Sequence, residues 1–492
     1  MKRKLLSKSK YLNGLQCQKY LWLLFNDKDK VPQPDASTQH VFAEGHRIGE
    51  LAKNLFPDGI ECSCDDLIGN LNNTRQALKA NRPLFEAGFY VDGYFSRLDI
   101  LNPVGDGIWD IYEVKGSTSV KPVNIEDVAF QRHCAQLAGL EIRKCFVVHL
   151  NNQYVKNGDI DLHQLFTIED VTEFSNEVSD CIIDRSEKMW EVIASPTCPD
   201  IGIGPHCSDP YDCPVTWCRE CLPEHNIFDL YRGGKKCFDM FNEGILFVKD
   251  IPKNYKLSAA QKIQQSCEIS GEPSIDRYAI QEFIESLNYP LYYLDFETFS
   301  PAIPIYDGSR PYQRIPFQFS LHVVKEPGKN PDHYGYLADG TCDPRPGFLE
   351  KLKEHVGDTG NIITYNMSFE KGVLKELGEA FPEYSDWIEE TLEQVIDLYA
   401  PFRGFSYYHP MQQGSASIKK VLPVLTGKGY DGMDIGKGDD ASLAFFNIVM
   451  RMFSEEEIRK VRQDLEKYCA LDTEGMIWIV EELSKLVSGT PV

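Results

Sequence analysis

The sequence contains no long apolar run, no internal repeat and no low-complexity tract. None of its apolar segments approaches the roughly 20 residues that a membrane span requires. The start, MKRKLLSKSKYLNGLQC, is basic but has neither the apolar core nor the small-residue cleavage site of a signal peptide. A hydrophobic share of 42% is that of a globular protein, and 492 residues exceed the size of one hydrophobic core. We therefore expect a cytoplasmic protein of two or three domains, with no membrane partner.

An excess of positive charge is also missing. The formal net charge of −23 argues against a protein that coats nucleic acid through a basic surface. An enzyme acting on nucleic acid stays compatible, because metal-site carboxylates add negative charge and bound cations supply the positive field that phosphates need. Five basic residues gather at the N-terminus, where a solubilising tail and a contact to DNA are equally good interpretations: Lys2, Arg3, Lys4, Lys8 and Lys10.

Cysteine, by contrast, is abundant, with 15 in the chain. Five of them crowd into residues 198–221, which in a reducing compartment indicates a metal site rather than disulfide bonds. The other scattered cysteines are expected to be free thiols that are mostly buried, among them Cys62, Cys64, Cys134, Cys145, Cys181, Cys237, Cys267, Cys342 and Cys469.

Apolar periodicity predicts a mixed α/β protein. Residues 1–55 are expected to be helical with an extended break near Lys30–Pro34, and residues 82–118 to form strands. From the strand in PLYYLDFETFS onward, helices and strands alternate as in an α/β domain. The predicted domains are residues 1–223, a connecting segment 224–285, and residues 286–492.

Two acids, Asp295 and Glu297, stand on the strand LYYLDFET. Positions i and i+2 of a strand share a face, so both carboxylates point the same way. On a mostly buried strand they repel each other and lose hydration, and a divalent cation is the usual neutralising agent. An edge strand with solvated acids is the alternative, which fits poorly with the apolar neighbours Leu291, Tyr293 and Phe299.

The last predicted helix carries an acid on its apolar side. Ser454 and Glu457 form a capping box at its start. An apolar stripe then follows through Ile458, Val461, Leu465 and Tyr468. Asp472 takes the next position on the stripe, one turn after Tyr468, so both side chains point the same way. The alternative is an acid at the edge of the stripe that reaches solvent.

Between these segments, NIITYNMSFEKGVLKEL predicts a short strand, then Asn366, then a helix carrying Glu370. Taken alone, an acid in a first helical turn is more often a partner of the helix dipole. Together, the three segments resemble the DnaQ-like exonuclease superfamily in its tyrosine-bearing branch, over roughly residues 288–487.

The motifs that carry this resemblance stand in the order of the superfamily. Its first motif, Asp-x-Glu, matches Asp295 and Glu297. Its third, Tyr-x-x-x-Asp, matches Tyr468 and Asp472. Its second normally reads Asn-x-x-x-Asp, and here Glu370 stands in the aspartate position, with a side chain one methylene longer.

The resemblance implies an RNase H-like fold and a 3′→5′ exonuclease. Two Mg²⁺ or Mn²⁺ ions held by the four carboxylates would hydrolyse phosphodiester bonds, and Tyr468 would orient the attacking water. Asn366 would support the site. In FSYYHPMQQGSASIKKVLP, Ser417 and Lys419 are candidates for substrate contact, although a plain loop-to-helix junction explains them equally well.

The first half contains a predicted β-hairpin, GYFSRLDILNPVGDGIWDIYEVKGST, with strands 94–101 and 108–115. Asp99 lies on its first strand, and Glu113 and Lys115 share a face of the second. This arrangement resembles PD-(D/E)xK nucleases, in which Asp99 and Glu113 would bind Mg²⁺ or Mn²⁺ and Lys115 would steer the attacking hydroxide. In DVAFQRHCAQLAGL, Gln131 matches a glutamine of the RecB-like branch, with a helix-surface glutamine as the alternative.

One early cysteine, Cys17, and the late run HCSDPYDCPVTWCREC surround this hairpin in the sequence. The pattern resembles iron–sulfur nucleases of the AddB and CRISPR-associated RecB-like type, whose four thiolates hold a [4Fe–4S] cluster. A structural Zn²⁺ is the alternative metal, and Cys221 or Cys198 could replace one of the ligands. The implied ligands are Cys17, Cys207, Cys213 and Cys218.

In one respect the sequence departs from the RecB-like pattern. Many such nucleases place a histidine four residues after a glycine of an early helix, whereas FAEGHRIGELA has Gly45 followed by Gly49, with His46 out of register. The whole chain is also similar to an uncharacterised bacterial family that joins a domain of unknown function to a RecB-like half.

Three functions follow from these patterns. The first is an enzyme with two nuclease sites that acts on DNA, most naturally single-stranded, in repair, recombination or defence. The second is a single exonuclease whose N-terminal half only binds nucleic acid. The third is an RNA 3′-end exonuclease, since the superfamily includes DNA and RNA enzymes. A scaffold without activity leaves the core-facing acids unexplained.

Overall fold

The structure, a computed structural model, describes residues 3–488, so Lys2 and the last four residues lie outside it. Internal contacts divide the chain into two compact units: Met1–Cys221 with Ala302–Tyr312, and Leu222–Pro301 with Gln313–Val492. The segment 224–285, expected from the sequence to connect two domains, therefore packs within the second unit. The chain is a mixed α/β protein with several sheets, as expected.

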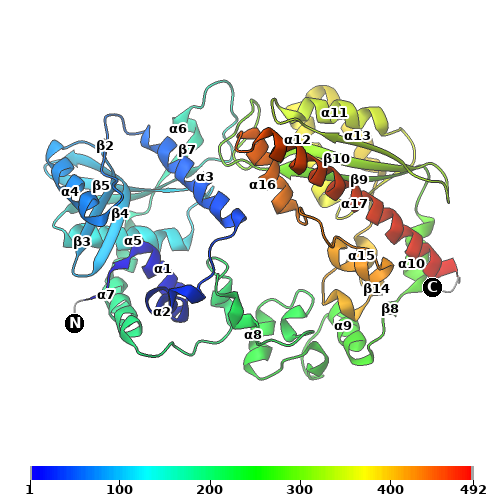
Figure 1. Cartoon of the computed structure of the whole chain (residues 1–492), viewed down its shortest axis with the longest axis horizontal. Coiled ribbons are helices and arrows are strands. Elements are labelled where there is room, and N and C mark those ends of the chain that lie inside the picture. Colours follow the sequence, from blue (N-terminus) through cyan, green and yellow to red (C-terminus); the bar gives the residue numbers. More distant parts are fainter. Residues whose placement is uncertain (1–2, 489–492) are drawn as a thin grey trace. The chain divides into compact units, whose positions relative to one another are not determined.

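The first unit is built on a seven-stranded mixed sheet (Figure 1). Short β1 (Leu6–Ser7) pairs in parallel with β4, which forms an antiparallel hairpin with β5 as expected. The hairpin turns at Asp106 and Gly107, which both have positive φ. The other strands follow in the spatial order β2 (Ile60–Glu61), β3 (Leu84–Val91), β4 (Tyr94–Gly105), β5 (Ile108–Lys115), β6 (Glu141–Leu150) and β7 (Phe166–Asp170).

Helix α5 crosses between the parallel strands β5 and β6 and packs on the sheet. Its buried residues Val128, Ala129 and Phe130 join a core cluster with strand residues such as Leu98 and Ile111. The break expected near Lys30–Pro34 falls between α2 and α3, so that prediction is confirmed. The helices of this unit are α1 (Lys8–Gln16), α2 (Gln18–Asn26), α3 (Ala36–Lys53), α4 (Leu67–Ala77), α5 (Pro122–Leu137), α6 (Leu162–Leu165) and α7 (Thr172–Ala194), with 3-10 turns η1 (Lys28–Lys30), η2 (Leu78–Ala80), η3 (Pro205–Cys207) and η4 (Thr216–Arg219).

A loop from later in the chain, Ala302–Tyr312, completes this unit. The backbone N–H groups of Lys156 and Gly308 donate to the carbonyls of Ser309 and Lys156 at 3.0 and 2.8 Å. Ala302 also joins the apolar cluster that includes Ile48 and Leu150.

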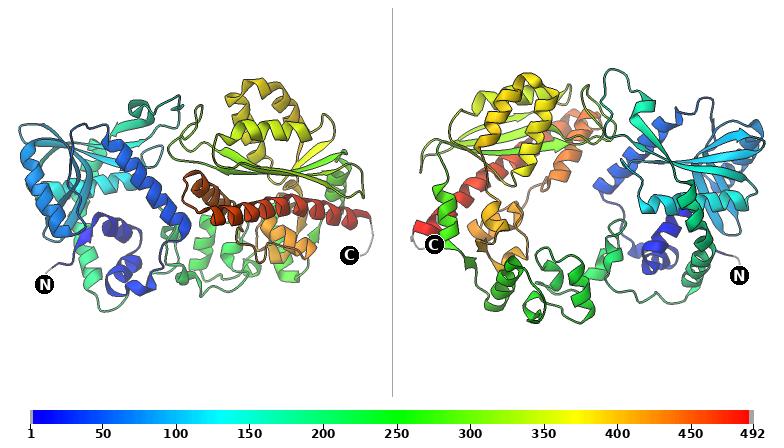
Figure 2. Two further views of the ribbon diagram at one scale, coloured as in Figure 1. Left: turned by 45° about the horizontal axis from the view of Figure 1, so that its top comes forward. Right: turned by 180° about the vertical axis from the view of Figure 1, so that it is seen from behind.

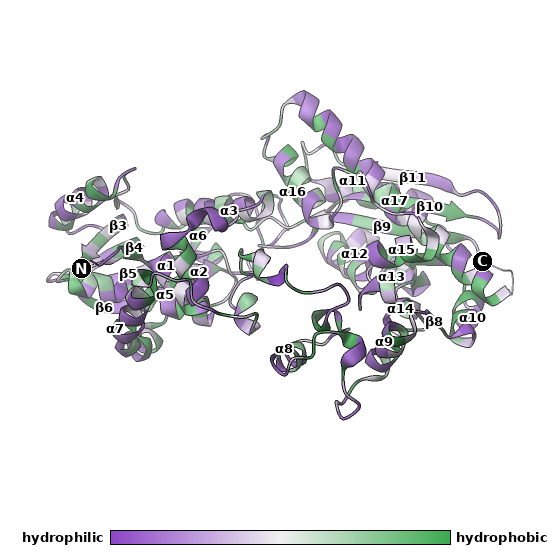
Figure 3. Ribbon diagram, turned by 60° about the horizontal axis from the view of Figure 1, so that its bottom comes forward, coloured by the Kyte–Doolittle hydropathy of each residue, from purple (hydrophilic) through white to green (hydrophobic). Residues whose placement is uncertain are grey.

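The second unit contains a five-stranded mixed sheet in the order β11-β10-β9-β12-β13. Strand β10 pairs antiparallel with both β9 and β11, whereas β12 pairs in parallel with both β9 and β13. Figure 3 shows hydrophilic residues along β11, whereas β10 alternates apolar residues with Gln318, Ser320 and His322 and is buried throughout. The strands are β9 (Leu291–Phe299), β10 (Ile315–Val324), β11 (Asp332–Leu337), β12 (Asn361–Thr364) and β13 (Val395–Asp397), and β8 (Ser274–Ile275) pairs with β14 (Tyr407–Tyr408) apart from them.

Helices cover both faces of this sheet (Figure 2). The 34-residue helix α17 crosses one face against β9 and β10, while α11 and α12 pack on the other. The bounds are α8 (Lys235–Asn242), α9 (Ala259–Ser270), α10 (Arg277–Glu285), α11 (Pro344–His355), α12 (Ser368–Ala380), α13 (Ser385–Gln394), α14 (Ala400–Arg403), α15 (Ile418–Thr426), α16 (Gly438–Val449) and α17 (Glu455–Ser488), with 3-10 turns η5 (Ile227–Asp229), η6 (Val248–Asp250), η7 (Pro382–Tyr384) and η8 (Pro410–Gln412).

The start of α17 is fixed by the expected capping box. The Ser454 backbone N–H donates to the Glu457 carboxylate at 2.8 Å, and the Glu457 N–H donates back to Ser454 Oγ at 3.4 Å. Neither this helix nor any other within residues 3–488 is both long and apolar enough to cross a membrane.

Candidate active sites

The strand β9 carries Asp295 and Glu297 in the middle of the second sheet. In the register with β10, Asp295 lies opposite Ser320 and Glu297 opposite Gln318. Glu297 is 6% exposed, and none of the residues described donates a hydrogen bond to its carboxylate. Because alternate residues of a strand share a face, both acids lie on the same face of the sheet. Of the two, only Asp295 is partly accessible to solvent.

The first turn of α12 adds Glu370. Its side chain is 2% exposed, and its Oε2 has no hydrogen-bond partner within residues 3–488. Asn366, just before the helix, adopts φ = 76°, and its Oδ1 accepts a hydrogen bond from Ser368 Oγ at 2.8 Å. Asn366 therefore shapes the turn that leads into the helix, and its amide oxygen is used locally.

Helix α17 brings Asp472 and Tyr468 to the same site, both buried on the side that faces the sheet. The hydroxyl of Tyr430, from the loop after α15, donates a hydrogen bond to Asp472 Oδ1. The Lys419 ammonium lies 5.2 Å from the Tyr468 ring and 5.7 Å from the Tyr430 ring, and it donates to the Gly436 carbonyl at 2.6 Å. Of the two substrate-contact candidates, Lys419 thus faces the site, while Ser417 is exposed at the cap of α15.

Burial and mutual repulsion dominate the electrostatics of the four carboxylates. Burial, followed by the charges of Asp472, Glu297 and Glu370, raises the pKa of Asp295 well above its usual range. Burial and the charge of Asp472 likewise raise the pKa of Glu297, and Lys419 partly opposes this. Burial raises the pKa of Glu370 to about 8. For Asp472 burial raises the pKa to about 6, opposed by the Tyr430 hydrogen bond and Lys419.

The sequence did not indicate the role of Cys469 beside these acids. We expected only a buried free thiol, whereas Cys469 Sγ lies 3.6 Å from Asp295 Oδ2. One ligand atom from each of Asp295, Glu297 and Cys469 falls within 4.8 Å of the others. The signal was present, because Cys469 follows Tyr468 and precedes Asp472 by three positions on one helix, but a cysteine in a core stripe is usually a packing residue.

This acidic site fits a divalent cation. Four carboxylates converge, and within residues 3–488 the Lys419 ammonium acts on Glu297 and Asp472 while the Arg314 guanidinium acts on Glu370. One Glu370 oxygen is buried without a hydrogen-bond partner in the same part of the chain. Buried charges of one sign are stable only when neutralised or paired. Carboxylate oxygens are the ligands that Mg²⁺ and Mn²⁺ prefer, so the donor set matches the expected ions.

In the first unit, the hairpin and α5 bring together all four residues expected there. Lys115 Nζ lies 2.6 Å from Glu113 Oε1, and Gln131 Nε2 donates to Glu113 Oε2, also at 2.6 Å. The Asp99 carboxylate accepts a hydrogen bond from the Val114 backbone N–H at 2.8 Å. Gln131 is completely buried, so it is not a helix-surface glutamine.

Two further residues, Lys8 and Asp127, belong to this cluster and were not predicted from the sequence. Lys8 Nζ lies 2.7 Å from Glu113 Oε1, 3.6 Å from Asp127 Oδ1 and 4.0 Å from Asp99 Oδ1. Burial lowers the pKa of Lys8, but Asp127, Glu113 and Asp99 together raise it well above its usual value. Lys115 also pairs with Asp127, so two ammonium groups compensate three acids.

A cavity of about 340 Å³ opens beside this cluster, with Asp99, Glu113 and Lys115 in its wall. Both Gly49 and His46 of α3 also line it. His46 was expected to be out of register with the family histidine, yet it reaches the same cavity because its position lies less than one helical turn from Gly49. A Cβ at Gly49 would meet nothing within 4 Å, so this wall is open.

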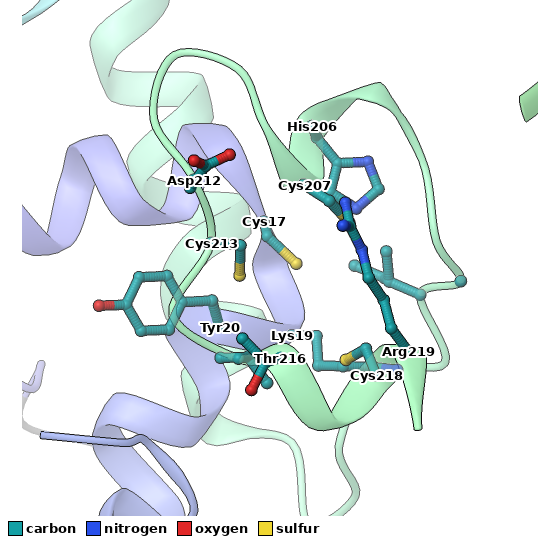
Figure 4. A pocket seen from close by; sticks show the side chains of 13 residues that line it. Cys17, Lys19, Tyr20, His206, Cys207, Asp212, Cys213, Thr216, Cys218 and Arg219 are labelled. Atoms are coloured by element: carbon teal, nitrogen blue, oxygen red, sulfur yellow. The ribbon is translucent and has the colours of Figure 1, made fainter. Parts of the chain in front are cut away.

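The expected cysteine ligands come together in a separate cavity of about 300 Å³ (Figure 4). Cys17 comes from the junction of α1 and α2, and its partners from the turns η3 and η4 and the loop between them. The thiols of Cys17, Cys213 and Cys218 point into the same space in Figure 4. The residues that line this cavity include all four expected ligands: Cys17, Cys207, Cys213 and Cys218.

Neither Cys221 nor Cys198, the two cysteines considered as alternative ligands, lines this cavity. Cys221 is exposed and outside the cavity, with its thiol donating to the Cys218 carbonyl. Cys198 is not in the cavity wall, although it is close enough to raise the pKa of Cys218, after burial and the charges of Cys17 and Cys207.

The chain is similar to known proteins and to a known domain, but none of these has an assigned activity. Residues 292–417 match the model of a domain of unknown function, DUF2779. An uncharacterised protein of Mycoplasma pneumoniae is 28% identical over 206 residues, covering 38% of this chain and 31% of that protein. An uncharacterised protein of Mycoplasma genitalium is 27% identical over 213 residues, and this match covers 40% of this chain and 32% of that protein. The chain thus spans about a third of the length of the curated relatives it matches.

Proposed function

We propose that the second unit is a metal-dependent nuclease that removes nucleotides from the 3′ end of nucleic acid, with single-stranded DNA as its first substrate. The observation that carries this proposal is the convergence of four carboxylates from β9, α12 and α17, three of them buried, with the Lys419 ammonium opposing two of them. The mixed sheet with helices on both faces supports the RNase H-like fold that the motifs implied.

Asp295, Glu297, Glu370 and Asp472 would hold Mg²⁺ or Mn²⁺. When bound, these ions activate water and stabilise the leaving oxygen of a phosphodiester. The chain itself supplies positioning. Tyr430 fixes the Asp472 carboxylate through its hydroxyl. Tyr468 orients the attacking water, and Lys419 attracts the substrate phosphate beside it.

A second nuclease site in the first unit is supported by the cluster of Asp99, Glu113, Lys115 and Gln131 in one cavity wall and its supporting helix. Glu113 and Asp99 would hold a divalent cation, and Lys115 would steer the nucleophile. Two lysines already compensate the acids here, so we expect this site to bind divalent cations more weakly than the site in the second unit.

The cysteine cavity would hold a structural metal centre, and we favour a [4Fe–4S] cluster. The four thiols line one cavity, and their spacing in the sequence resembles that of iron–sulfur nucleases, which favours the cluster over the alternative of a structural zinc ion. Anaerobic purification with iron and zinc analysis tests this assignment, and a colourless protein that contains zinc alone would overturn it.

The deciding experiment uses 5′-labelled single-stranded DNA with Mg²⁺ or Mn²⁺. We expect the wild type to produce a ladder that shortens from the 3′ end, and Asp295→Asn to lose at least about a hundredfold of this activity. Glu466→Gln removes an exposed acid of the same helix as Asp472 and is the matched control. Undiminished hydrolysis by Asp295→Asn overturns the proposal.

The same assay separates the alternatives. In the Asp295→Asn background, residual cleavage that disappears with Glu113→Gln supports the second nuclease site. If no cleavage remains but Glu113→Gln weakens DNA binding, the first unit is a binding module. A matched RNA substrate is included, and strong preference for it would identify an RNA 3′-end exonuclease. Repair, recombination and defence remain the proposed settings of a DNA enzyme.

A further inference from the structure

Cys469 gives the carboxylate site of the second unit a sulfur donor. It is completely buried on α17, and its Sγ lies 3.6 Å from Asp295 Oδ2. Ligand atoms of Asp295, Glu297 and Cys469 lie within 4.8 Å of one another. This trio is the tightest set of potential metal ligands in the described part of the chain.

Within residues 3–488, one fully buried carboxylate oxygen near the trio, Glu370 Oε2, has no hydrogen-bond partner. Glu297 is 6% exposed and receives no hydrogen bond from the described residues. Glu370 Oε2 is buried and equally without a hydrogen bond within residues 3–488, and the Glu370 charge acts on both Asp295 and Glu297. The Cys469 thiol donates to Asp295 Oδ2, but the Glu370 oxygen and the Glu297 carboxylate have no such donor among the described residues, and a bound cation would neutralise their negative charge.

The donor chemistry selects the class of cation. Mg²⁺ takes oxygen ligands and retains water, so it gains little from a thiol. Zn²⁺ and the softer Cd²⁺ accept carboxylate oxygen and thiolate sulfur in one coordination sphere. A three-ligand O,O,S set is therefore better suited to a zinc-like ion than to Mg²⁺.

We propose that Asp295, Glu297 and Cys469 form a binding site for a thiophilic divalent cation of the zinc class. On binding, the Cys469 S–H bond breaks, its proton leaves to solvent, and a sulfur–metal bond forms without any change in oxidation state. Two of the ligands are shared with the Mg²⁺ or Mn²⁺ site, so Zn²⁺ excludes the catalytic ions. This consequence, unlike the binding itself, rests on the proposed nuclease function.

Binding is tested with Cd²⁺, whose bond to a thiolate gives an ultraviolet charge-transfer band. The full-length wild type, Cys469→Ser and Cys267→Ser are titrated with Cd²⁺ under identical conditions. Cys267 is also a buried thiol of the same unit, but it lies in a separate apolar cluster, which makes it the matched control. The cysteine cavity of the first unit contributes equally to all three and cancels in the difference spectra.

The inference requires one Cd²⁺ equivalent and its band to be lost in Cys469→Ser and retained in Cys267→Ser. Equal bands in all three proteins overturn it. If Cys469→Ser does not fold, Glu297→Gln keeps the thiol and removes one carboxylate. We then expect Cd²⁺ affinity to fall at least about tenfold, and an unchanged affinity would overturn the inference.

A second arm measures Zn²⁺ inhibition of Mg²⁺-supported DNA hydrolysis. We expect half-inhibition of the wild type and of Cys267→Ser at a concentration about tenfold below that needed for Cys469→Ser. If the protein has no nuclease activity, the proposed function is wrong, but the metal inference still stands, because the Cd²⁺ band is measured without substrate. Normal nuclease activity without the Cys469-dependent band would sink the metal inference alone.

Discussion

At the scale of single residues, Glu370 shows how the second unit accommodates a longer acid. Glu370, in the first turn of α12, lies close enough to β9 for its charge to raise the pKa of Asp295 and of Glu297. The cost is an oxygen that is buried without a hydrogen bond. In the metal-free chain, burial raises the pKa of this side chain to about 8, so it keeps its proton near neutral pH.

Glu370→Gln should therefore change the pH dependence of stability in EDTA. The folded chain holds the Glu370 proton up to about pH 8, whereas the unfolded chain releases it near pH 4.5, so stability falls as pH rises through this window. From about pH 5 to about pH 7 this contribution amounts to roughly 3 kcal/mol. The glutamine variant should lose that part of the slope in urea unfolding. Glu393→Gln, which removes an exposed acid of α13, should keep the wild-type slope.

Tyr430→Phe tests the positioning of Asp472. The variant removes only the hydroxyl that donates to Asp472 Oδ1, so the carboxylate loses its orientation and a bond that favours its charged form. We expect Mn²⁺ affinity to fall about tenfold and activity to be partly restored by raised Mn²⁺. Tyr407→Phe, a buried tyrosine of β14, is the control. Loss of activity with unchanged Mn²⁺ binding would contradict a positioning role.

These residues also show what the sequence could and could not reveal. Asp295, Glu297 and Asp472 were detectable because an acid in an apolar strand or stripe violates a local pattern. Tyr430 stands in a loop and violates none, and Lys419 was a candidate for substrate contact that a plain loop-to-helix junction explained equally well. Only the folded chain, in which α15 and its following loop lie against α17, shows that they face the acids.

At the scale of elements, the short strand β1 determines the chemistry of the first unit. Its parallel pairing with the start of β4 fixes the chain immediately before α1, and Ser7 caps that helix. Lys8, the first residue of α1, is thereby held against Glu113. From the sequence it was one of five basic residues in an N-terminal run, because a two-residue strand leaves no periodic signal.

Lys8→Gln should make the acid cluster of the first unit a better site for divalent cations. Removing an ammonium 2.7 Å from Glu113 Oε1 leaves three acids with Lys115 alone. Mn²⁺ affinity should rise at least about tenfold, measured by electron paramagnetic resonance in an Asp295→Asn/Glu297→Gln background. Lys4→Gln is the control, since Lys4 contacts Asn26 instead. Unchanged or weaker Mn²⁺ binding would show that Lys8 does not compete with the metal.

For the longest element, α17, the sequence predicted the start and the buried side but not the roles of Cys469 and Thr473. Its capping box and apolar stripe fixed its start and its buried side. Thr473 could not be assigned, although its hydroxyl contacts Ser320 Oγ at 2.7 Å and His322 Nδ1 at 2.8 Å. This buried polar contact fixes the helix on β10 next to Asp472, and a lone threonine in a helix gives no sign of such a partner.

At the scale of the whole molecule, each unit has its own sheet and its own apolar core. The sequence indicated two α/β halves because their strands and helices follow regular periods. The sequence did not indicate that Ala302–Tyr312 packs with the first unit. This packing depends on contacts between residues about 150 positions apart, such as the hydrogen bond from the Gly308 N–H to the Lys156 carbonyl. Nor could the sequence place the segment 224–285, whose polar composition concealed a small core around Ile227 and Met240.

If the cysteine cavity holds the proposed metal centre, its loss should destabilise the first unit selectively. Cys17 and Cys213 are far apart in the sequence but line one cavity, so a bound metal centre cross-links the two ends of this unit and its binding energy adds to folding. Cys213→Ser should therefore lower the first unit's unfolding transition in calorimetry by several degrees or more, while the second unit's transition stays in place. Cys181→Ser, which changes an exposed thiol of the same unit, should leave both transitions unchanged.

A metal centre that serves only catalysis would leave the thermogram of Cys213→Ser unaltered, because the folded unit would then depend on its apolar core alone. Equal destabilisation of both transitions would mean instead that the two units unfold as one cooperative body.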